Sequence, residues 1–228
     1  MKILGFDKLS LVDYPGLTCA IIFVGGCNFK CPFCHNAGLV YSEEIEISQE
    51  EIFAYLNKRK GLIDAVCISG GEPTLYKDLP ELIKLVRDLG FKVKLDTNGT
   101  NPEMLQSLID NRMLDYVAMD IKNSIKCYPQ TSGCSSEMLN KAKASIEILK
   151  RNVVPYEFRT TLVKEFHDAN SIKEMGALVN GCEKLYLQKF VENENCIQKG
   201  LNEVDIKQAD EFIGILSKYV RNVKLRGY

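Results

Sequence analysis

Six short apolar runs rich in β-branched residues recur along the chain, and amphipathic segments separate them. Several runs are apolar at successive positions, which is typical of parallel strands that are covered on both faces. The sequence therefore predicts strands over residues 18–25, 64–69, 91–97, 115–122, 155–163 and 184–190.

The intervening segments carry helical periodicity and recognisable start signals. Ser48 with Glu51, and Asp78 with Glu81, fit the capping box that begins a helix, and Asn101 precedes a proline that suits a first helical turn. Three further helical faces lie at Met138–Leu149, Ile172–Val179 and Ile206–Val220.

Strands that alternate with helices predict an α/β fold. Right-handed crossovers join parallel strands into one sheet, so six such units form either an open doubly wound sheet or an incomplete barrel. No low-complexity linker interrupts them, and we expect a single domain over residues 1–228. In both folds functional residues gather at the carboxyl ends of the strands.

Composition excludes several classes of function. The net charge is −1 without a basic block, so binding to nucleic acid is not indicated. The longest apolar run, Cys19–Val24, is far shorter than the ~20 residues that span a bilayer. The amino terminus does not resemble a secretory signal, and we expect a cytoplasmic protein that makes no membrane contact. In that compartment an odd count of nine cysteines indicates metal or catalytic use rather than disulfides.

Unusual polar and glycine-rich segments follow four successive predicted strands. The segment "GGCNFKCPFCHN" (25–36) follows the first, "SGGEPT" (69–74) the second and "DTNGT" (96–100) ends the third, while Asp120 and Lys122 end the fourth. The sequence therefore predicts one functional site at this rim.

The segment 25–36, called the cysteine loop below, fits four chemistries. A c-type haem site would use Cys31, Cys34 and His35, but it requires export and leaves Cys27 unexplained. A thiol–disulfide pair of Cys31 and Cys34 also ignores Cys27, and it has no use for the polar ends of the next strands.

Zinc and an iron–sulfur cluster remain. A structural zinc site needs four protein ligands, and adjacent Cys34 and His35 are poorly placed to share one ion, although Cys67 could complete the set. A cubane cluster uses Cys27, Cys31 and Cys34 and leaves the fourth iron open. An open metal position is typical of a catalytic site.

The pattern C-x3-C-x2-C at Cys27, Cys31 and Cys34, followed by "GGEP" (70–73), resembles the radical S-adenosylmethionine (SAM) enzymes.

Four segments of the sequence indicate a particular group within the radical SAM enzymes. "VDYPG" (12–16), the cysteine loop, "DTNG" (96–99) and "MDIK" (119–122) are similar to the activating enzymes of glycyl radical enzymes, above all to those of anaerobic ribonucleoside-triphosphate reductases.

The resemblance implies a partial (β/α)6 TIM-like barrel with one [4Fe-4S] cluster that binds and reductively cleaves SAM. It further implies a 5′-deoxyadenosyl radical that abstracts hydrogen from a glycine of a partner enzyme, with reduced flavodoxin or ferredoxin as electron donor.

The resemblance also implies which residues bind SAM. Gly70 and Gly71 let backbone approach the ligand, and Glu72 or neighbouring carbonyls accept hydrogen bonds from the SAM amine. Phe33 offers an apolar surface for adenine, and His35 lies at the same edge.

Charged residues at later strand ends are implied to complete this site. Asp96 and Asn98 meet ribose hydroxyls or a cation, Lys122 meets the SAM carboxylate, Asp120 positions it or joins a cation site, and Arg159 contacts ribose or carboxylate. Each also has an ordinary structural interpretation, such as a surface pair of Asp120 with Lys122.

The sixth predicted strand departs from some relatives, which have a histidine there that contacts SAM. Here "LYLQKF" offers Gln188 as a candidate instead. Two other functions stay open: a small-molecule radical SAM enzyme, such as a 7-carboxy-7-deazaguanine synthase-like enzyme, and a non-catalytic interaction protein with a zinc clip.

Overall fold

One curved sheet forms the framework of the protein. The computed structural model describes all residues from Met1 to Tyr228. Each strand pairs with the next one in the chain, antiparallel between the first two and parallel thereafter. The strands are β1 (Ile3–Ser10), β2 (Cys19–Val24), β3 (Ala65–Gly70), β4 (Lys92–Thr97), β5 (Tyr116–Asp120), β6 (Tyr156–Leu162), β7 (Lys184–Lys189) and β8 (Asn222–Arg226).

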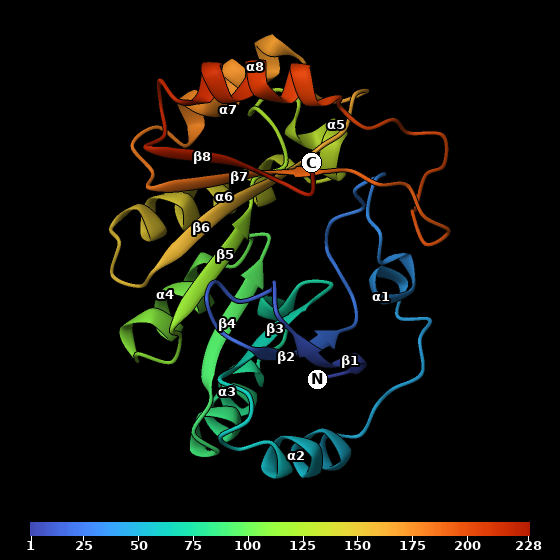
Figure 1. Ribbon diagram of the computed structural model, residues 1–228, viewed down its shortest axis with the longest axis vertical. Coiled ribbons are helices and arrows are strands. Elements are labelled where there is room, and N and C mark those ends of the chain that lie inside the picture. The colour runs from blue at the N-terminus through green and yellow to red at the C-terminus, as the bar shows by residue number, and fades with distance from the viewer.

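The strand order decides between the two predicted sheet types. It runs from β1 to β8 without a reversal, whereas a doubly wound sheet reverses at a switch point. Strands β1 and β8 do not pair, so the sheet is an incomplete barrel (Figure 1). The α/β fold and the six predicted strands, β2 to β7, are confirmed, and β1 and β8 are additions that the sequence did not indicate.

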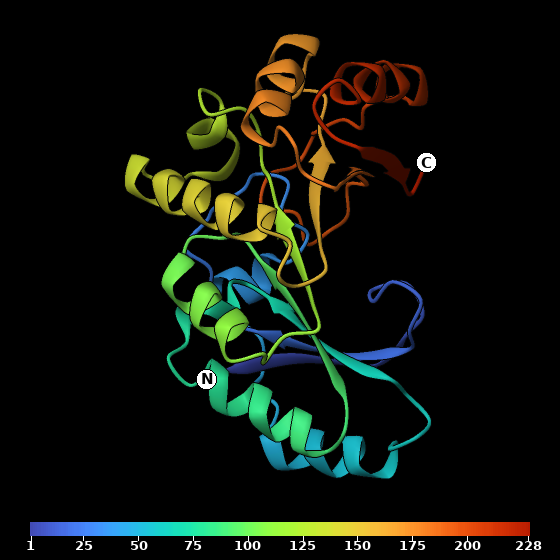
Figure 2. The same ribbon diagram turned by 90° about the vertical axis from the view of Figure 1, so that its left-hand side faces the viewer.

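Most helices lie on the outer side of the sheet, while the cysteine loop and α1 lie on the opposite side (Figure 1, Figure 2). They are α1 (Ala37–Tyr41), α2 (Gln49–Lys58), α3 (Leu79–Asp88), α4 (Pro102–Asp110), α5 (Tyr128–Ser132), α6 (Ser136–Lys150), α7 (Ala169–Leu178) and α8 (Ile206–Leu216). The predicted helices correspond to α2, α3, α4, α6, α7 and α8.

All three helices with a predicted start begin directly after the predicted residue, Ser48, Asp78 or Asn101. Ser48 and Asn101 each accept a hydrogen bond from the backbone N–H three residues on. Asp78 also directly precedes its helix, α3, but its side chain makes no capping hydrogen bond, so the capping box predicted there is wrong. Its carboxylate instead accepts from the amino group of Met1 at 2.6 Å, because a charged ammonium is a stronger partner than a backbone amide.

The two faces of the sheet differ in chemistry. Outward side chains of the strands pack with the helices in one large apolar cluster. The concave face has a small apolar cluster near the amino ends of β2, β3 and β5, which contains Tyr14, Cys19, Ile21, Ala65, Cys67 and Tyr116. The thiols of Cys19 and Cys67 are buried there, with the sulfur atoms 3.5 Å apart. At this end one buried carboxylate, Glu157, accepts a hydrogen bond from the Tyr116 hydroxyl at 3.1 Å and pairs with Arg226.

None of the helices combines the length and hydrophobicity that crossing a bilayer requires.

Candidate active site

A cavity of about 390 Å³ opens at the carboxyl ends of the strands. All the residues that the sequence predicted for the site line it, except Glu72. They are Cys27, Cys31, Phe33, Cys34, His35, Gly70, Gly71, Asp96, Asn98, Asp120, Lys122, Arg159 and Gln188. Eight further lining residues were not predicted, namely Asp13, Phe23, Phe29, Asn36, Val40, Ser69, Thr97 and Thr161.

Backbone contacts with the end of β3 hold the start of the cysteine loop. The N–H of Gly71 donates to the carbonyl of Val24, and the N–H of Glu72 donates to that of Gly26, both at 2.9 Å. A Cβ atom on Gly71 would lie 1.9 Å from the carbonyl oxygen of Gly26. The close backbone approach expected at Gly71 is therefore made with the cysteine loop itself.

The far side of the cysteine loop is held by a segment late in the chain. Ile197 N–H donates to the Cys34 carbonyl at 3.2 Å, and Gln198 N–H donates to the Pro32 carbonyl at 2.8 Å. In return, Ala37 N–H donates to the carbonyl of Asn195 at 3.2 Å. The three cysteines thus lie on a loop that is fixed at both sides.

Glu72 does not face the cavity, which corrects its expected contact with the SAM amine. Its side chain is fully buried, and it accepts hydrogen bonds from Thr74, from the Thr97 hydroxyl at 2.7 Å and from the Asn98 N–H at 2.6 Å. Burial raises the pKa of Glu72, while these bonds favour the carboxylate. Glu72 thereby joins the end of β3 to the end of β4.

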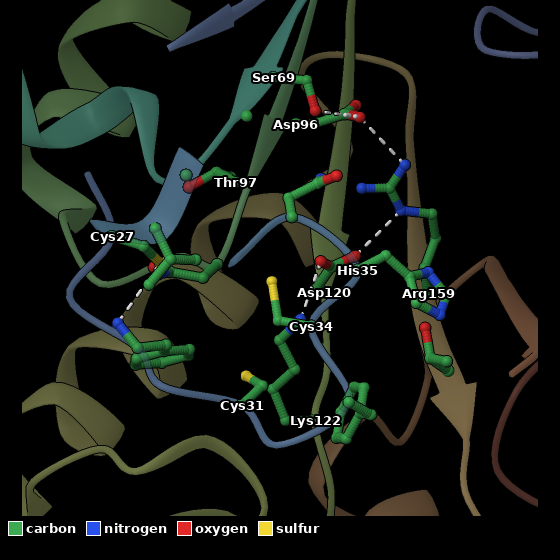
Figure 3. A pocket seen from close by; sticks show the side chains of 18 of the residues that line it. Cys27, Cys31, Cys34, His35, Ser69, Asp96, Thr97, Asp120, Lys122 and Arg159 are labelled. Carbon is green, nitrogen blue, oxygen red and sulfur yellow. Dashed lines mark hydrogen bonds and ion pairs between the residues drawn. The ribbon is translucent and has the colours of Figure 1, made fainter. Parts of the chain in front are cut away.

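Five charged side chains of alternating sign line the concave face, and we call them the charge chain: Lys94, Asp96, Arg159, Asp120 and Lys122. Figure 3 shows the last four of them. Lys94 pairs with Asp96, and Arg159 contacts Asp96 at 3.1 Å and Asp120 at 3.0 Å. Lys122 ends the chain at 3.0 Å from Asp120. Lys94 is only 1% exposed and was missed by the sequence analysis.

The charge chain keeps its carboxylates ionised. Burial alone would raise the pKa of Asp120, but the neighbouring Lys122 and Arg159 outweigh it and lower the pKa to about 2. Burial likewise opposes ionisation of Asp96, yet Arg159 and Lys94 lower its pKa. Lys94 lies behind Asp96 and does not line the cavity, whereas Lys122, the other cationic end of the charge chain, does line it.

Aromatic rings form another part of the cavity wall. Phe33 is buried and lies at a tilt against Phe166, with ring centroids 6.0 Å apart. The ring of His35 stacks on Phe190 at 5.3 Å, and its Nε2 atom is buried without a hydrogen-bond partner. Burial lowers the pKa of His35, which favours the neutral ring. A buried polar atom without a partner suits a ligand that would satisfy it.

Comparison with known protein families identifies the superfamily to which this chain belongs. The Radical SAM superfamily model matches residues 21–169. The chain belongs to this superfamily. Radical SAM enzymes use a [4Fe-4S] cluster and SAM, and the protein is therefore an enzyme with these cofactors.

Individual relatives agree with this assignment. Two Methanocaldococcus jannaschii proteins, both provisionally named glycyl-radical enzyme activating enzymes, are 37% and 28% identical to the chain. The first alignment covers 97% of this chain and 94% of the relative, and the second covers 96% and 85%. The structure of Streptococcus suis SuiB bound to S-adenosylmethionine aligns with a TM-score of 0.69 and 15% identity, covering 91% of this chain and 52% of SuiB, which shows a shared fold.

The three thiols of this radical SAM enzyme fit its cluster. Cys27, Cys31 and Cys34 are free and line the same cavity. No set of three or more cysteine, histidine or carboxylate side chains converges as a single metal ion would need, whereas a cubane takes each thiolate at a separate iron. Burial raises the pKa of Cys27 to about 12 and of Cys31 to about 11, so binding of iron has to displace their protons.

Replacing Gly71 by alanine tests the contact between β3 and the cysteine loop. Because the new methyl group would collide with the Gly26 carbonyl, we expect Gly71→Ala to destabilise the iron-free protein by about 3 kcal/mol and to reduce its iron uptake. Urea unfolding and iron analysis measure the two effects. Gly214→Ala is the control, since a Cβ there meets nothing within 4 Å. Wild-type stability and iron uptake in Gly71→Ala would contradict this role.

The charge chain predicts a pH dependence. The depressed pKa of Asp120 gives stability that is present above the ordinary value of 3.8 and is lost as pH falls toward 2. We expect Asp120→Asn to lower the free energy of unfolding by roughly 2 kcal/mol at pH 7, and the deficit to vanish between pH 4 and pH 2. Urea unfolding of the iron-free proteins measures it, with the exposed Asp88→Asn as control. A deficit that is equal at pH 7 and pH 2 would disprove the prediction.

Proposed function

We propose that this enzyme activates a glycyl radical enzyme, and that its partner is an anaerobic ribonucleoside-triphosphate reductase. The cavity that unites three free thiols with the positive end of the charge chain carries the proposal, because it can hold a cluster and an amino-acid ligand side by side. The two relatives that align over most of the chain, with their names, support the activating role.

The cluster, when bound by Cys27, Cys31 and Cys34, supplies the electron that cleaves SAM. Lys122 donates one hydrogen bond to Asp120, so its ammonium keeps donors for the carboxylate of SAM. Asp96 and Arg159 lie across the cavity for ribose or carboxylate oxygens.

The aromatic wall serves the adenine of SAM in this proposal. Phe33 supplies an apolar surface, and Nε2 of the neutral His35 supplies a hydrogen-bond partner. Gln188, two residues before Phe190 on the same wall, takes the place of the late histidine of some relatives.

The gap in the barrel suits a polypeptide substrate. Strands β1 and β8 do not close the sheet, so a loop of a partner protein can approach the concave face from the side. Asp13, within "VDYPG" between β1 and β2, lines the cavity and is held by the hydroxyl of Ser10. This segment is one of those that favour the reductase as partner.

The proposal treats residues 1–228 as one functional domain, since a single sheet runs from Ile3 to Arg226. We infer a cytoplasmic location, because all nine cysteines are free thiols and a reducing compartment keeps them so. Reduced flavodoxin or ferredoxin is the proposed electron donor.

Anaerobic reconstitution tests the proposed function. We expect about four irons and four sulfides per chain, and 5′-deoxyadenosine from SAM under reducing conditions. With the reductase present, electron paramagnetic resonance should show a glycyl radical. Cys31→Ala should abolish SAM cleavage, while Cys127→Ser, outside the cavity, should retain it.

Three other outcomes would contradict parts of this proposal. SAM cleavage that needs a small heterocycle and gives no radical on the reductase would favour the small-molecule alternative. One zinc and no iron would favour the zinc-clipped interaction protein. Equal activity of Cys31→Ala and wild type would remove the cluster from the mechanism.

A further inference from the structure

Three side chains form a closed ring of hydrogen bonds beside the first cluster cysteine. The amide of Asn98, after β4, donates to the Oδ1 atom of Asn28 at 2.8 Å. Asn28 donates in turn to the Thr100 hydroxyl at 2.8 Å, and this hydroxyl donates to Oδ1 of Asn98 at 2.7 Å. Since Asn28 follows Cys27 directly, the ring ties the cysteine loop to the end of β4.

The ring fixes which end of the Asn98 amide faces Cys27. Oδ1 of Asn98 accepts from both the hydroxyl and the backbone N–H of Thr100, the latter at 3.0 Å. Nδ2 must then lie on the other side, where one hydrogen goes to Asn28 and the second points to the Cys27 sulfur at 3.9 Å. The backbone N–H of Asn98 is held by buried Glu72.

These contacts argue against the expected role of Asn98 as a ligand of the ribose hydroxyls or of a cation. Asn98 as a whole residue is 5% exposed, and both the oxygen and the nitrogen of its side-chain amide make hydrogen bonds within the protein. A ribose hydroxyl would have to displace one of these bonds. The sulfur of Cys27 also accepts a hydrogen bond from the backbone N–H of Phe29 at 3.4 Å. Two N–H groups, those of Phe29 and Asn98, therefore point at this sulfur.

We propose that Asn98 is a positioning residue that directs an N–H at the Cys27 sulfur and thereby raises the reduction potential of the [4Fe-4S] cluster. The inference rests on the proposed function, which places the cluster on Cys27. One-electron reduction by flavodoxin or ferredoxin adds negative charge that the thiolate sulfurs share. A hydrogen bond to such a sulfur stabilises the reduced state more than the oxidised state.

Redox titration of the reconstituted protein, followed by electron paramagnetic resonance, tests the inference. Asn98→Leu is close in size and neutral but cannot donate, and Asn98→Asp replaces the donor by a negative charge. We expect both variants to have a more negative midpoint potential. At the wild-type midpoint the ratio of reduced to oxidised cluster should fall about tenfold, which equals about 59 mV for one electron.

Asn101→Asp is the matched control. It introduces the same charge three residues on, at a position whose side chain donates to the Thr74 carbonyl and caps α4 rather than facing a thiol. A small shift is expected there. If Asn98→Leu kept the wild-type midpoint with the wild-type iron content, or if Asn101→Asp shifted the midpoint as far as Asn98→Asp, the inference would be wrong.

A measurement on the wild type covers the case in which the Asn98 variants lose the cluster. With ¹⁵N at the asparagine side-chain amides, pulsed electron paramagnetic resonance of the reduced cluster should show a ¹⁵N coupling. Its absence would overturn the inference and leave the proposed function standing. A wild-type protein that binds no iron after reconstitution would instead overturn the proposed function.

Discussion

The site depends on ion pairs between the buried carboxylates and the buried cationic side chains of the concave face. Lys94 and Asp96 lie two residues apart on β4, and Asp120 and Arg159 are register partners on β5 and β6, so the pleat of a parallel sheet brings four of the five charges together. Removal of one member would leave a partner buried and unpaired, which destabilises the folded protein. The same pairing leaves Lys122 as the cationic end of the row, beside the three thiols.

The interior strands were predictable and the edge strands were not, for one physical reason. Strands covered on both faces need apolar residues at successive positions, as "CAIIFV" of β2 has. Strand β1 is exposed at Asp7 and Lys8, and β8 is at least partly exposed throughout. Each lies at one edge of the open barrel, where polar side chains are common. A search for apolar runs therefore finds the middle of the sheet and misses both ends.

Residues of the site could be predicted when their place at the end of a strand was enough to bring them to the cavity. They could not be predicted when the direction of the side chain determined whether it faced the cavity. Glu72 follows β3 as expected, but it turns into the protein because Thr74, Thr97 and Asn98 supply its hydrogen bonds. Lys94 is hidden in "FKVKLDT", since lysine is rarely buried. Strand alternation does place it on the face of Asp96, and this was the available signal.

The hydrogen bonds that Ile197 and Gln198 donate to the cysteine loop, and the one that the Asn195 carbonyl accepts from Ala37 just after it, have a consequence for biogenesis. A ribosome-bound chain that ends before Gln198 has made all three thiols but lacks the backbone partners that shape the loop around them. Metal loading in the final geometry is thus a late event, which follows synthesis of nearly the whole polypeptide.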